Sequence, residues 1–241
     1  MNVATEKSGS GFPQSYWSIV VQPDASAESG RAALGKLCRR YWLPVYAHVR
    51  RAGHPPAIAQ DITRTFLHRL EHGAVAEVPP APRPRFRDYL LGKLHDFLAG
   101  DWRELQDDDE DPEDPPFAGL EARYQRECTH CATPDEAFQC SFANEVITRA
   151  MARLREEAEH NGHGDMYDAL LPYLSRDPQP GDVDALATRL DRRPLALMVA
   201  LKRLRQRFRE LAGRELSDTV SSSGELADEQ RTLHAILRSV R

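Results

Sequence analysis

Apolar residues recur at three- and four-residue steps along most of this chain, the spacing that places them on one face of an α-helix. In the first half, the pattern predicts helices over residues 34–51, with a kink at Pro44, 58–70 and 86–105. In the second half, it predicts a long helix over residues 133–157 and shorter helices beyond it. No stretch shows the alternation of apolar and polar residues that is typical of a β-strand. The sequence therefore predicts an all-α fold.

A strongly acidic segment interrupts this pattern. Residues 107–116, DDDEDPEDPP, hold seven acids and no base, so the rest of the chain carries a net charge of +2 although the whole chain carries −5. Such a segment repels itself and has no apolar surface to bury, which is typical of a solvated linker. We therefore expect two helical domains joined by an acidic linker. The alternative role for these acids is self-inhibition, in which they cover a basic surface of the same chain.

The second half contains the pattern of a helix-turn-helix. A short amphipathic helix over residues 183–190 is followed by a three-residue break and a long helix that begins at Pro194. Between Arg192 and Arg209 there are seven basic residues and no acidic one. Such a run beside a helix-turn-helix favours DNA as the partner, because the second helix of this motif enters the major groove. The alternative is a solvated basic helix face without a ligand.

Three segments resemble the extracytoplasmic-function sigma factors of bacteria. Residues 38–70 and 85–105 resemble region two of that family, and residues 186–211, LATRLDRRPLALMVALKRLRQRFREL, resemble its promoter-binding region four. The order of the segments is that of the family. The resemblance rests on these residues: Tyr41, Trp42, Asp61, Ile62, Phe66, Arg85, Phe86, Arg87, Leu204 and Arg205.

The resemblance implies a protein without catalytic activity or cofactor, which binds core RNA polymerase, recognises promoter DNA and initiates transcription. Region four would dock on the upstream promoter element, and region two would open the DNA. The C-terminal extension would cover region four or contact a regulator. The implied parts are a region-two domain over residues 16–105, the acidic linker over 106–132, a region-four domain over 133–216 and a helical extension over 217–241.

Two groups of side chains are candidates for DNA contact by their position in the family. One group lies in the helix-turn-helix, and the other lies in the helix that would face the melting promoter strand, where Trp102 would stack on an unpaired base. Phe97 lies on the apolar stripe of that helix and is expected in the core instead. The candidate DNA-binding residues are Arg192, Arg193, Lys202, Arg203, Arg205, Arg207, Arg85, Arg87, Lys93 and Trp102.

The helix around residues 61–70 would contact the polymerase. Relatives commonly carry a glutamine and an acid where this chain carries threonine and arginine, so this helix has lost negative charge. We therefore hypothesise that a serine/threonine kinase phosphorylates Thr63, which would restore about −1.5 to −2 charges. The alternative is an ordinary helical threonine without a regulatory role. The candidate polymerase-binding residues are Asp61, Thr63, Arg64, Thr65 and Arg69.

Other classes of protein have less support. A DNA-binding regulator that acts without polymerase would keep the helix-turn-helix and bind a palindromic site as a dimer. Cys128, His130, Cys131 and Cys140 suggest a zinc site, but no second CxxC or HxxxH motif completes the set, so we expect no metal. The motifs of serine hydrolases, zinc proteases and nucleotide-binding loops are absent, so we expect no enzyme.

The sequence also predicts where the protein resides. The longest uninterrupted apolar run, residues 195–201, has seven residues, far below the roughly 20 that a membrane-spanning helix needs. The N-terminal residues lack the apolar segment of a signal peptide. We therefore expect a cytoplasmic protein, without a membrane partner, whose four cysteines are reduced.

Overall fold

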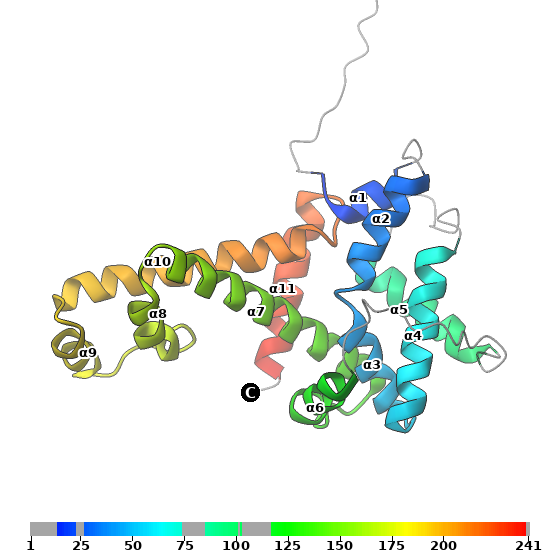
Figure 1. Ribbon diagram of the computed structural model, residues 1–241, viewed down its shortest axis with the longest axis horizontal. Helices are drawn as coiled ribbons and strands as arrows, with labels where there is room; N and C mark the ends of the chain where they lie inside the picture. Colours follow the sequence, from blue (N-terminus) through cyan, green and yellow to red (C-terminus); the bar gives the residue numbers. More distant parts are fainter. Residues whose placement is uncertain (1–13, 23–26, 74–84, 101, 103–116, 240–241) are drawn as a thin grey trace, which may run out of the picture. The chain divides into compact units, whose positions relative to one another are not determined.

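The computed structural model describes residues 14–22, 27–73, 85–100, 102 and 117–239. Every regular element in this part of the chain is a helix, as Figure 1 shows. The all-α prediction is therefore confirmed. None of the helices in the described ranges is long and apolar enough to cross a membrane. The acidic segment, residues 107–116, lies outside the described ranges.

The chain divides into two compact units whose boundaries differ from those that the resemblance implies. The first unit comprises Met1–Glu145 together with Leu216–Arg241, and the second comprises Val146–Glu215. One boundary lies within the helix Pro134–His160 and the other within the helix Pro194–Ser217, so neither coincides with a loop that a sequence pattern would mark. The residues of the expected C-terminal extension belong to the same unit as the N-terminal helices.

The described helices of the two units are as follows. The first unit contains α1 (Tyr16–Val20), α2 (Ala27–Cys38), α3 (Trp42–Arg51), α4 (Pro56–His72), α5 (Phe86–Ala99), α6 (Phe117–Glu127), the first part of α7 (Pro134–His160) and α11 (Ser223–Ser239). The second unit contains the rest of α7, α8 (Gly164–Leu170), the short 3-10 helix η3 (Leu171–Tyr173), α9 (Asp182–Leu190) and most of α10 (Pro194–Ser217).

The helix predicted over residues 34–51 is two helices in the structure. α2 ends at Cys38 and α3 begins at Trp42, which places Pro44 in the first turn of α3. Proline is tolerated in a first turn, because the N–H groups there have no partner within the helix. A break before Trp42 therefore replaces the kink that was predicted at Pro44.

An aromatic cluster lies in the core of the first unit. The ring centroid of Phe86 lies 5.1 Å from that of Tyr41 and 5.2 Å from that of Trp17, and all three side chains are completely buried. These residues come from α1, from the turn before α3 and from α5, so the cluster joins helices that are distant in sequence. Phe97, which was expected in the core, packs against Phe66 with a centroid distance of 5.4 Å but is only partly buried.

The segment after α10 contacts both α1 and α5. The backbone amide of Trp17 donates to the carbonyl of Asp218 over 3.1 Å, and that of Phe86 donates to the carbonyl of Thr219 over 3.2 Å. The hydroxyl of Ser15 donates to the carbonyl of residue 220 over 2.6 Å. These bonds satisfy backbone groups at the starts of two helices, and they connect the two ends of the described chain within one unit.

Residues that were expected in the linker form α6 and pack against α3. Arg50 donates two hydrogen bonds to the Glu121 carboxylate, of 2.8 and 3.0 Å, and the Tyr46 hydroxyl donates a third of 2.5 Å. The Arg50 hydrogen bond, with that of Tyr46, lowers the pKa of Glu121 to about 2. Residues 117–127 of the expected linker are therefore helical, and α6 is too short and polar for its apolar pattern to have predicted it.

Candidate nucleic-acid interface

The second unit contains the predicted helix-turn-helix, formed by α9 and α10. Asp191 follows α9 in the left-handed conformation, with φ 50° and ψ 52°, which aspartate tolerates better than most residues. The backbone amide of Arg192 donates to the carbonyl of Ala187 over 3.0 Å and closes the end of α9. Pro194 then begins α10, where its missing N–H group costs nothing. The turn therefore forms without a glycine.

The two helices of the motif share one apolar core. Leu186 and Ala187 of α9, and Leu197 and Leu201 of α10, are each at most 7% exposed. Residues of α8 and η3 complete the same cluster. Burial of this stripe holds the two helices at a fixed angle and leaves the opposite face of α10 in solvent.

Four basic side chains are exposed at the turn and along the first half of α10. In the part of the chain that the structure describes, none of the four forms an ion pair, so each is available to a polyanion. Arg192 and Arg193 lie in the break between α9 and α10. Lys202 and Arg203 lie about two turns into α10.

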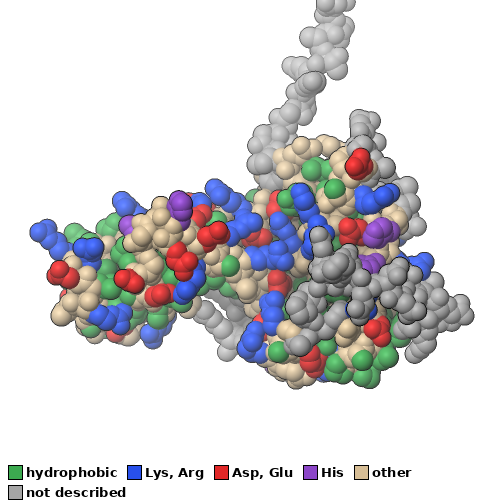
Figure 2. Space-filling model, in the orientation of Figure 1, with side chains coloured by type: hydrophobic (Ala, Val, Ile, Leu, Met, Phe, Trp, Pro, Cys, Tyr) green, Lys and Arg blue, Asp and Glu red, His purple; other side chains and the backbone are tan. Residues whose placement is uncertain are grey.

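α10 also exposes large apolar side chains between these bases. Leu195, Met198 and Val199 are 76%, 44% and 43% exposed. Figure 2 shows basic and hydrophobic side chains side by side at the end of the molecule where α9 meets α10, at the left of the view. This combination suits a DNA groove, because phosphates attract basic side chains and thymine methyl groups contact apolar side chains.

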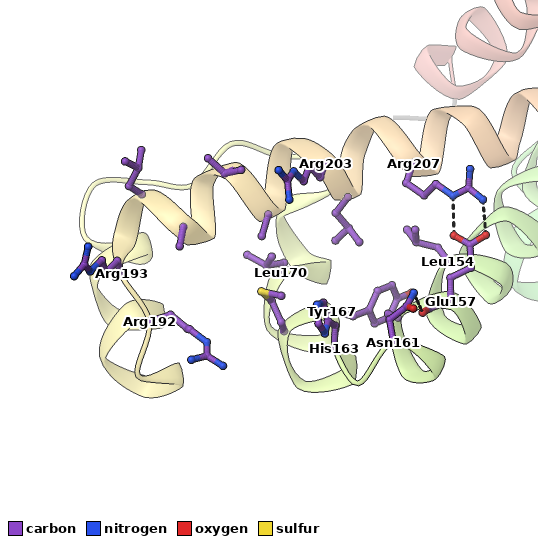
Figure 3. Close-up of a pocket in the computed structure, with 17 residues that line it drawn as sticks. Leu154, Glu157, Asn161, His163, Tyr167, Leu170, Arg192, Arg193, Arg203 and Arg207 are labelled. Carbon is purple, nitrogen blue, oxygen red and sulfur yellow. Dashed lines mark hydrogen bonds and ion pairs between the residues drawn. The ribbon is translucent and has the colours of Figure 1, made fainter.

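A cavity of about 700 Å³ lies beside the start of α10, within the second unit (Figure 3). Tyr167 and Leu170 of α8 line one side of it, with His163 before that helix. Arg192 and Arg203 are also among its lining residues, so basic groups stand over an apolar floor. The exposed basic surface is therefore hollowed on this side, as a ligand-binding surface commonly is.

Two of the predicted DNA-binding arginines are engaged inside the second unit. Arg205 donates to the carbonyls of Tyr173, over 2.7 and 3.0 Å, and of Arg176, over 2.6 Å, and so satisfies acceptors at the end of η3. Arg207 donates to both oxygens of Glu157 over 2.7 and 2.5 Å, the bonds dashed in Figure 3. These bonds raise the pKa of Arg207 above its ordinary value. Both arginines therefore have partners within the second unit.

The predicted DNA-binding residues of the first unit are mostly covered. Arg87 is 2% exposed and Trp102 is 6% exposed, so neither side chain reaches a phosphate or an unpaired base in this conformation. Arg87 pairs with Glu229 of α11 over 3.0 Å, and Arg85 pairs with the same carboxylate over 2.9 Å. Lys93 is partly exposed. The apolar and charge patterns missed this burial because the partner carboxylate is 142 residues from Arg87.

α4 exposes only part of the predicted polymerase contact. Asp61 and Arg64 are partly exposed, and Arg69 is exposed. Thr63 and Thr65 are buried, with 0% and 3% exposure. Of the predicted polymerase-binding side chains, α4 therefore exposes only the three charged ones, Asp61, Arg64 and Arg69.

The hydroxyl of Thr63 is occupied as well as buried. It donates to the carbonyl of Ala59 over 2.7 Å, one turn earlier in α4. This is the arrangement of an ordinary helical threonine. A kinase reaches this hydroxyl only if α4 is displaced from the unit.

The α9–α10 surface thus offers basic side chains without ion-pair partners among the described residues, together with exposed apolar groups, on a rigid pair of helices. This is the chemistry of a surface that binds a polyanion.

No family model matches this chain, and no curated protein or solved structure is similar to it at a significant level.

Proposed function

We propose that this chain is an alternative sigma factor of the extracytoplasmic-function type, which binds core RNA polymerase, recognises promoter DNA and initiates transcription in the cytoplasm. One observation carries the proposal: the α9–α10 helix-turn-helix exposes unpaired basic side chains at its turn and along α10. The resemblance of residues 38–70 and 85–105 to region two supports the polymerase partner. The factor itself has no catalytic role.

In this proposal the N-terminal end of α10 enters the major groove. Arg192 and Arg193 contact phosphates at the turn and fix the register of the helix on the duplex. Leu195 and Val199 face base edges, where an apolar side chain distinguishes the methyl group of thymine. Arg203, two turns further along, contacts a phosphate on the far side of the groove.

The proposed polymerase contact uses α4. Its exposed and partly exposed charges, Asp61, Arg64 and Arg69, form the surface that a partner would meet. Burial of the Thr63 hydroxyl argues against a phosphorylation switch at this residue in the folded chain. The proposed factor is therefore competent to bind polymerase without modification by a kinase.

A polymerase-independent regulator is the second candidate function. The same helix-turn-helix supports it, because its exposed basic side chains need no other protein in order to contact phosphate. Such a regulator would act as a dimer on a palindromic site with half-sites one helical turn apart.

The test is co-elution of the full chain with bacterial core RNA polymerase, followed by transcription of a genomic fragment library and mapping of the transcript ends. We expect wild type to co-elute and to produce discrete start sites. The double variant Arg192→Ala/Arg193→Ala should co-elute but lose the start sites. A matched control, Arg126→Ala/Arg231→Ala, removes two exposed charges of the first unit and should behave as wild type.

The two candidate functions give different results in this experiment. A chain that fails to co-elute with polymerase, yet binds a palindromic DNA fragment as a dimer, is a regulator and not a sigma factor. A chain that does neither overturns both.

A further inference from the structure

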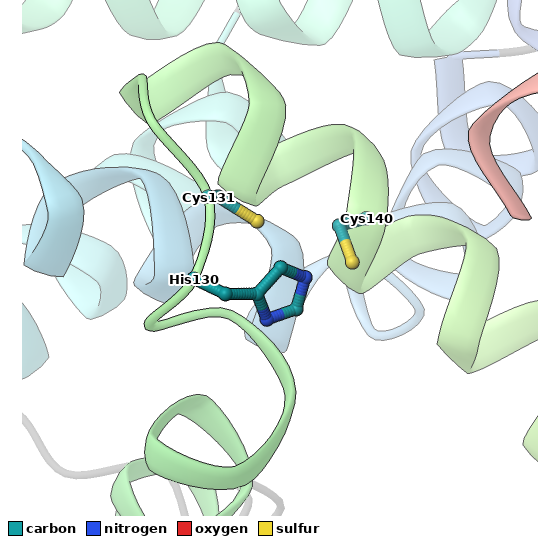
Figure 4. A group of neighbouring side chains, drawn as sticks. All are labelled: His130, Cys131 and Cys140. Atoms are coloured by element: carbon teal, nitrogen blue, oxygen red, sulfur yellow. The ribbon is translucent and has the colours of Figure 1, made fainter. Parts of the chain in front are cut away.

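Four potential metal ligands meet where α6 turns back into α7. Cys128, His130 and Cys131 lie in the turn after α6, and Cys140 lies in the second turn of α7. The ligand atoms of His130, Cys131 and Cys140 all lie within 4.8 Å of one another (Figure 4). The Cys140 thiol also hydrogen-bonds the thiol of Cys128. One sulfur thus contacts three other ligand groups.

The cluster combines three buried thiols with one exposed imidazole. Cys128, Cys131 and Cys140 are 0%, 6% and 3% exposed, whereas His130 is exposed. The sulfurs are therefore shielded, and an ion would enter or leave on the side of the histidine. Structural zinc sites are commonly of this composition, with four ligands and no open position.

The turn that carries the ligands is held by bonds of its own. The Cys131 amide donates to the Cys128 carbonyl over 3.1 Å. The Thr133 hydroxyl accepts from the amide of Glu136 over 3.1 Å, and the Glu136 carboxylate accepts from the amide of Thr133 over 3.3 Å, so α7 starts with reciprocal capping bonds. The same carboxylate accepts from the amide of Ala132 over 2.8 Å. The backbone of the turn is therefore positioned before any ion binds.

Two further residues support the cluster. Arg51 of α3 donates to the carbonyls of Cys131 and Ala132 and so ties the turn to another helix. The side-chain amide of Asn144 lies 3.9 Å from the Cys140 sulfur, to which it donates a hydrogen bond. Hydrogen bonds to a ligand from the surrounding shell orient it and tune a metal site.

We propose that Cys128, His130, Cys131 and Cys140 bind one zinc ion in a tetrahedral site. Binding releases the thiol protons to solvent, since the thiolate is the ligand, and the neutral imidazole of His130 supplies the fourth donor. Thiolates around zinc lie about 3.8 Å apart, given Zn–S bonds of about 2.3 Å. The ligand atoms of His130, Cys131 and Cys140, all within 4.8 Å of one another, therefore lie close to this spacing. Three sulfurs and one nitrogen favour zinc over harder divalent ions.

The bound ion would clamp α6 to the start of α7. These two helices are joined by only six residues, 128–133. A metal ion that crosslinks residue 128 to residue 140 therefore contributes directly to folding of this part of the first unit.

A second cluster provides a natural control. His48, His95 and Asp135 also bring their ligand atoms within 4.8 Å of one another. It holds no sulfur, and two of its three side chains are exposed. Co²⁺ bound there in place of zinc would lack a thiolate band, and metal binding would respond to different substitutions.

The test uses the full chain, purified without chelator and then dialysed against Zn²⁺, with metal content measured by mass spectrometry. We expect about one zinc per chain in wild type, in Cys38→Ser and in His95→Ala, and less than about a tenth of that in Cys140→Ser. Cys38 is a matched control, because it is a buried cysteine outside the cluster. Far-ultraviolet circular dichroism shows whether each variant is folded.

Replacement of zinc by Co²⁺ makes the test independent of the variants. Wild type should show the visible bands of tetrahedral Co²⁺ and the near-ultraviolet band of cobalt bound to thiolate. Asn144→Ala should weaken zinc binding about tenfold without removing it, since it leaves all four ligands in place.

Several results would overturn the proposal. A wild-type zinc content in Cys140→Ser contradicts the site. Loss of zinc in His95→Ala would place the ion at the second cluster. An octahedral Co²⁺ spectrum of wild type contradicts the thiolate site even where Cys140→Ser does not fold. Wild type that takes up no zinc and instead contains a disulfide between Cys140 and a neighbouring cysteine identifies a redox pair in place of the metal site.

Discussion

The guanidinium of Arg87 and the carboxylate of Glu229 form an ion pair of 3.0 Å that is almost completely buried, with side-chain exposures of 3% and 1%. Arg87 also lies 5.2 Å from the centroid of the Phe142 ring. Burial raises the pKa of Glu229, although Arg87 and Arg85 act in the opposite direction. The pair therefore fixes α11 against α5 at a considerable cost in desolvation.

Removing one partner of this pair should destabilise the first unit strongly. We expect Glu229→Gln to lower the free energy of unfolding by about 3 to 5 kcal/mol, because it leaves the Arg87 charge buried without a counterion. Asp228→Asn, an exposed neighbour on α11, should change it by less than about 0.5 kcal/mol. Urea denaturation measures both, and equal effects of the two variants would mean that the buried pair is not important for stability.

Thr63→Glu should disrupt the fold and not imitate a phosphorylated, active state. The residue is 0% exposed and its hydroxyl already donates to the Ala59 carbonyl, so a carboxylate there would be buried and we expect a loss of several kcal/mol. Thr63→Val removes the hydroxyl but keeps the shape and should cost about 1 kcal/mol. A Thr63→Glu variant that is as stable as wild type and binds polymerase more tightly would restore the phosphorylation hypothesis.

The basic residues of α10 should separate into two classes. Arg203→Ala should weaken DNA binding and reduce the slope of log affinity against log salt by about 1, while the unfolding midpoint stays unchanged. Arg205→Ala should lower the unfolding midpoint of the second unit, because the carbonyls of Tyr173 and Arg176 lose their donor. Fluorescence anisotropy with DNA and thermal unfolding distinguish the two classes, and identical behaviour of both variants would refute the division.

Stability should fall as the pH drops from about 6.5 towards 4. Burial lowers the pKa of His48 to about 4; Asp135 opposes this shift and His95 adds to it. In the unfolded chain the same imidazole takes up its proton near pH 6.5, so over this interval the unfolded state binds more protons and is favoured. The loss attributable to His48 is on the order of 1 to 3 kcal/mol.

This pH dependence is measured by urea denaturation of wild type and His48→Gln at pH 7 and pH 5, with chelator present so that metal ions do not contribute. His48→Gln should lose part of the difference between the two pH values. The same difference in both proteins would show that His48 does not titrate on unfolding.

The apolar periodicity was sufficient to predict the class of the fold and the helix-turn-helix, because both depend on local spacing. The turn at Asp191 and the start of α10 at Pro194 follow from residues within a few positions of each other. The break between α2 and α3 was harder to predict, since the apolar spacing continues from Leu37 to Tyr41 across the turn that separates the two helices.

The parts that sequence patterns missed depend on contacts over long distances. Glu229 is one acid among many, and nothing near it in sequence shows that it covers Arg87. Likewise, the sequence named Cys128, His130, Cys131 and Cys140 as a weak zinc signal and led us to expect no metal, because only the turn between α6 and α7 shows that Cys140 lies beside the others. Side-chain identity could be read from the sequence, but whether a charge is buried could not.

The hydrogen bonds from Trp17 and Phe86 to residues 218 and 219 have a consequence for how the protein is made. The first unit includes residues from both ends of the chain, and the second unit, Val146–Glu215, is inserted between them. On the ribosome, the second unit emerges complete while the first still lacks α11. The helix-turn-helix is thus able to fold during synthesis, whereas the first unit stays incomplete until α11 has emerged.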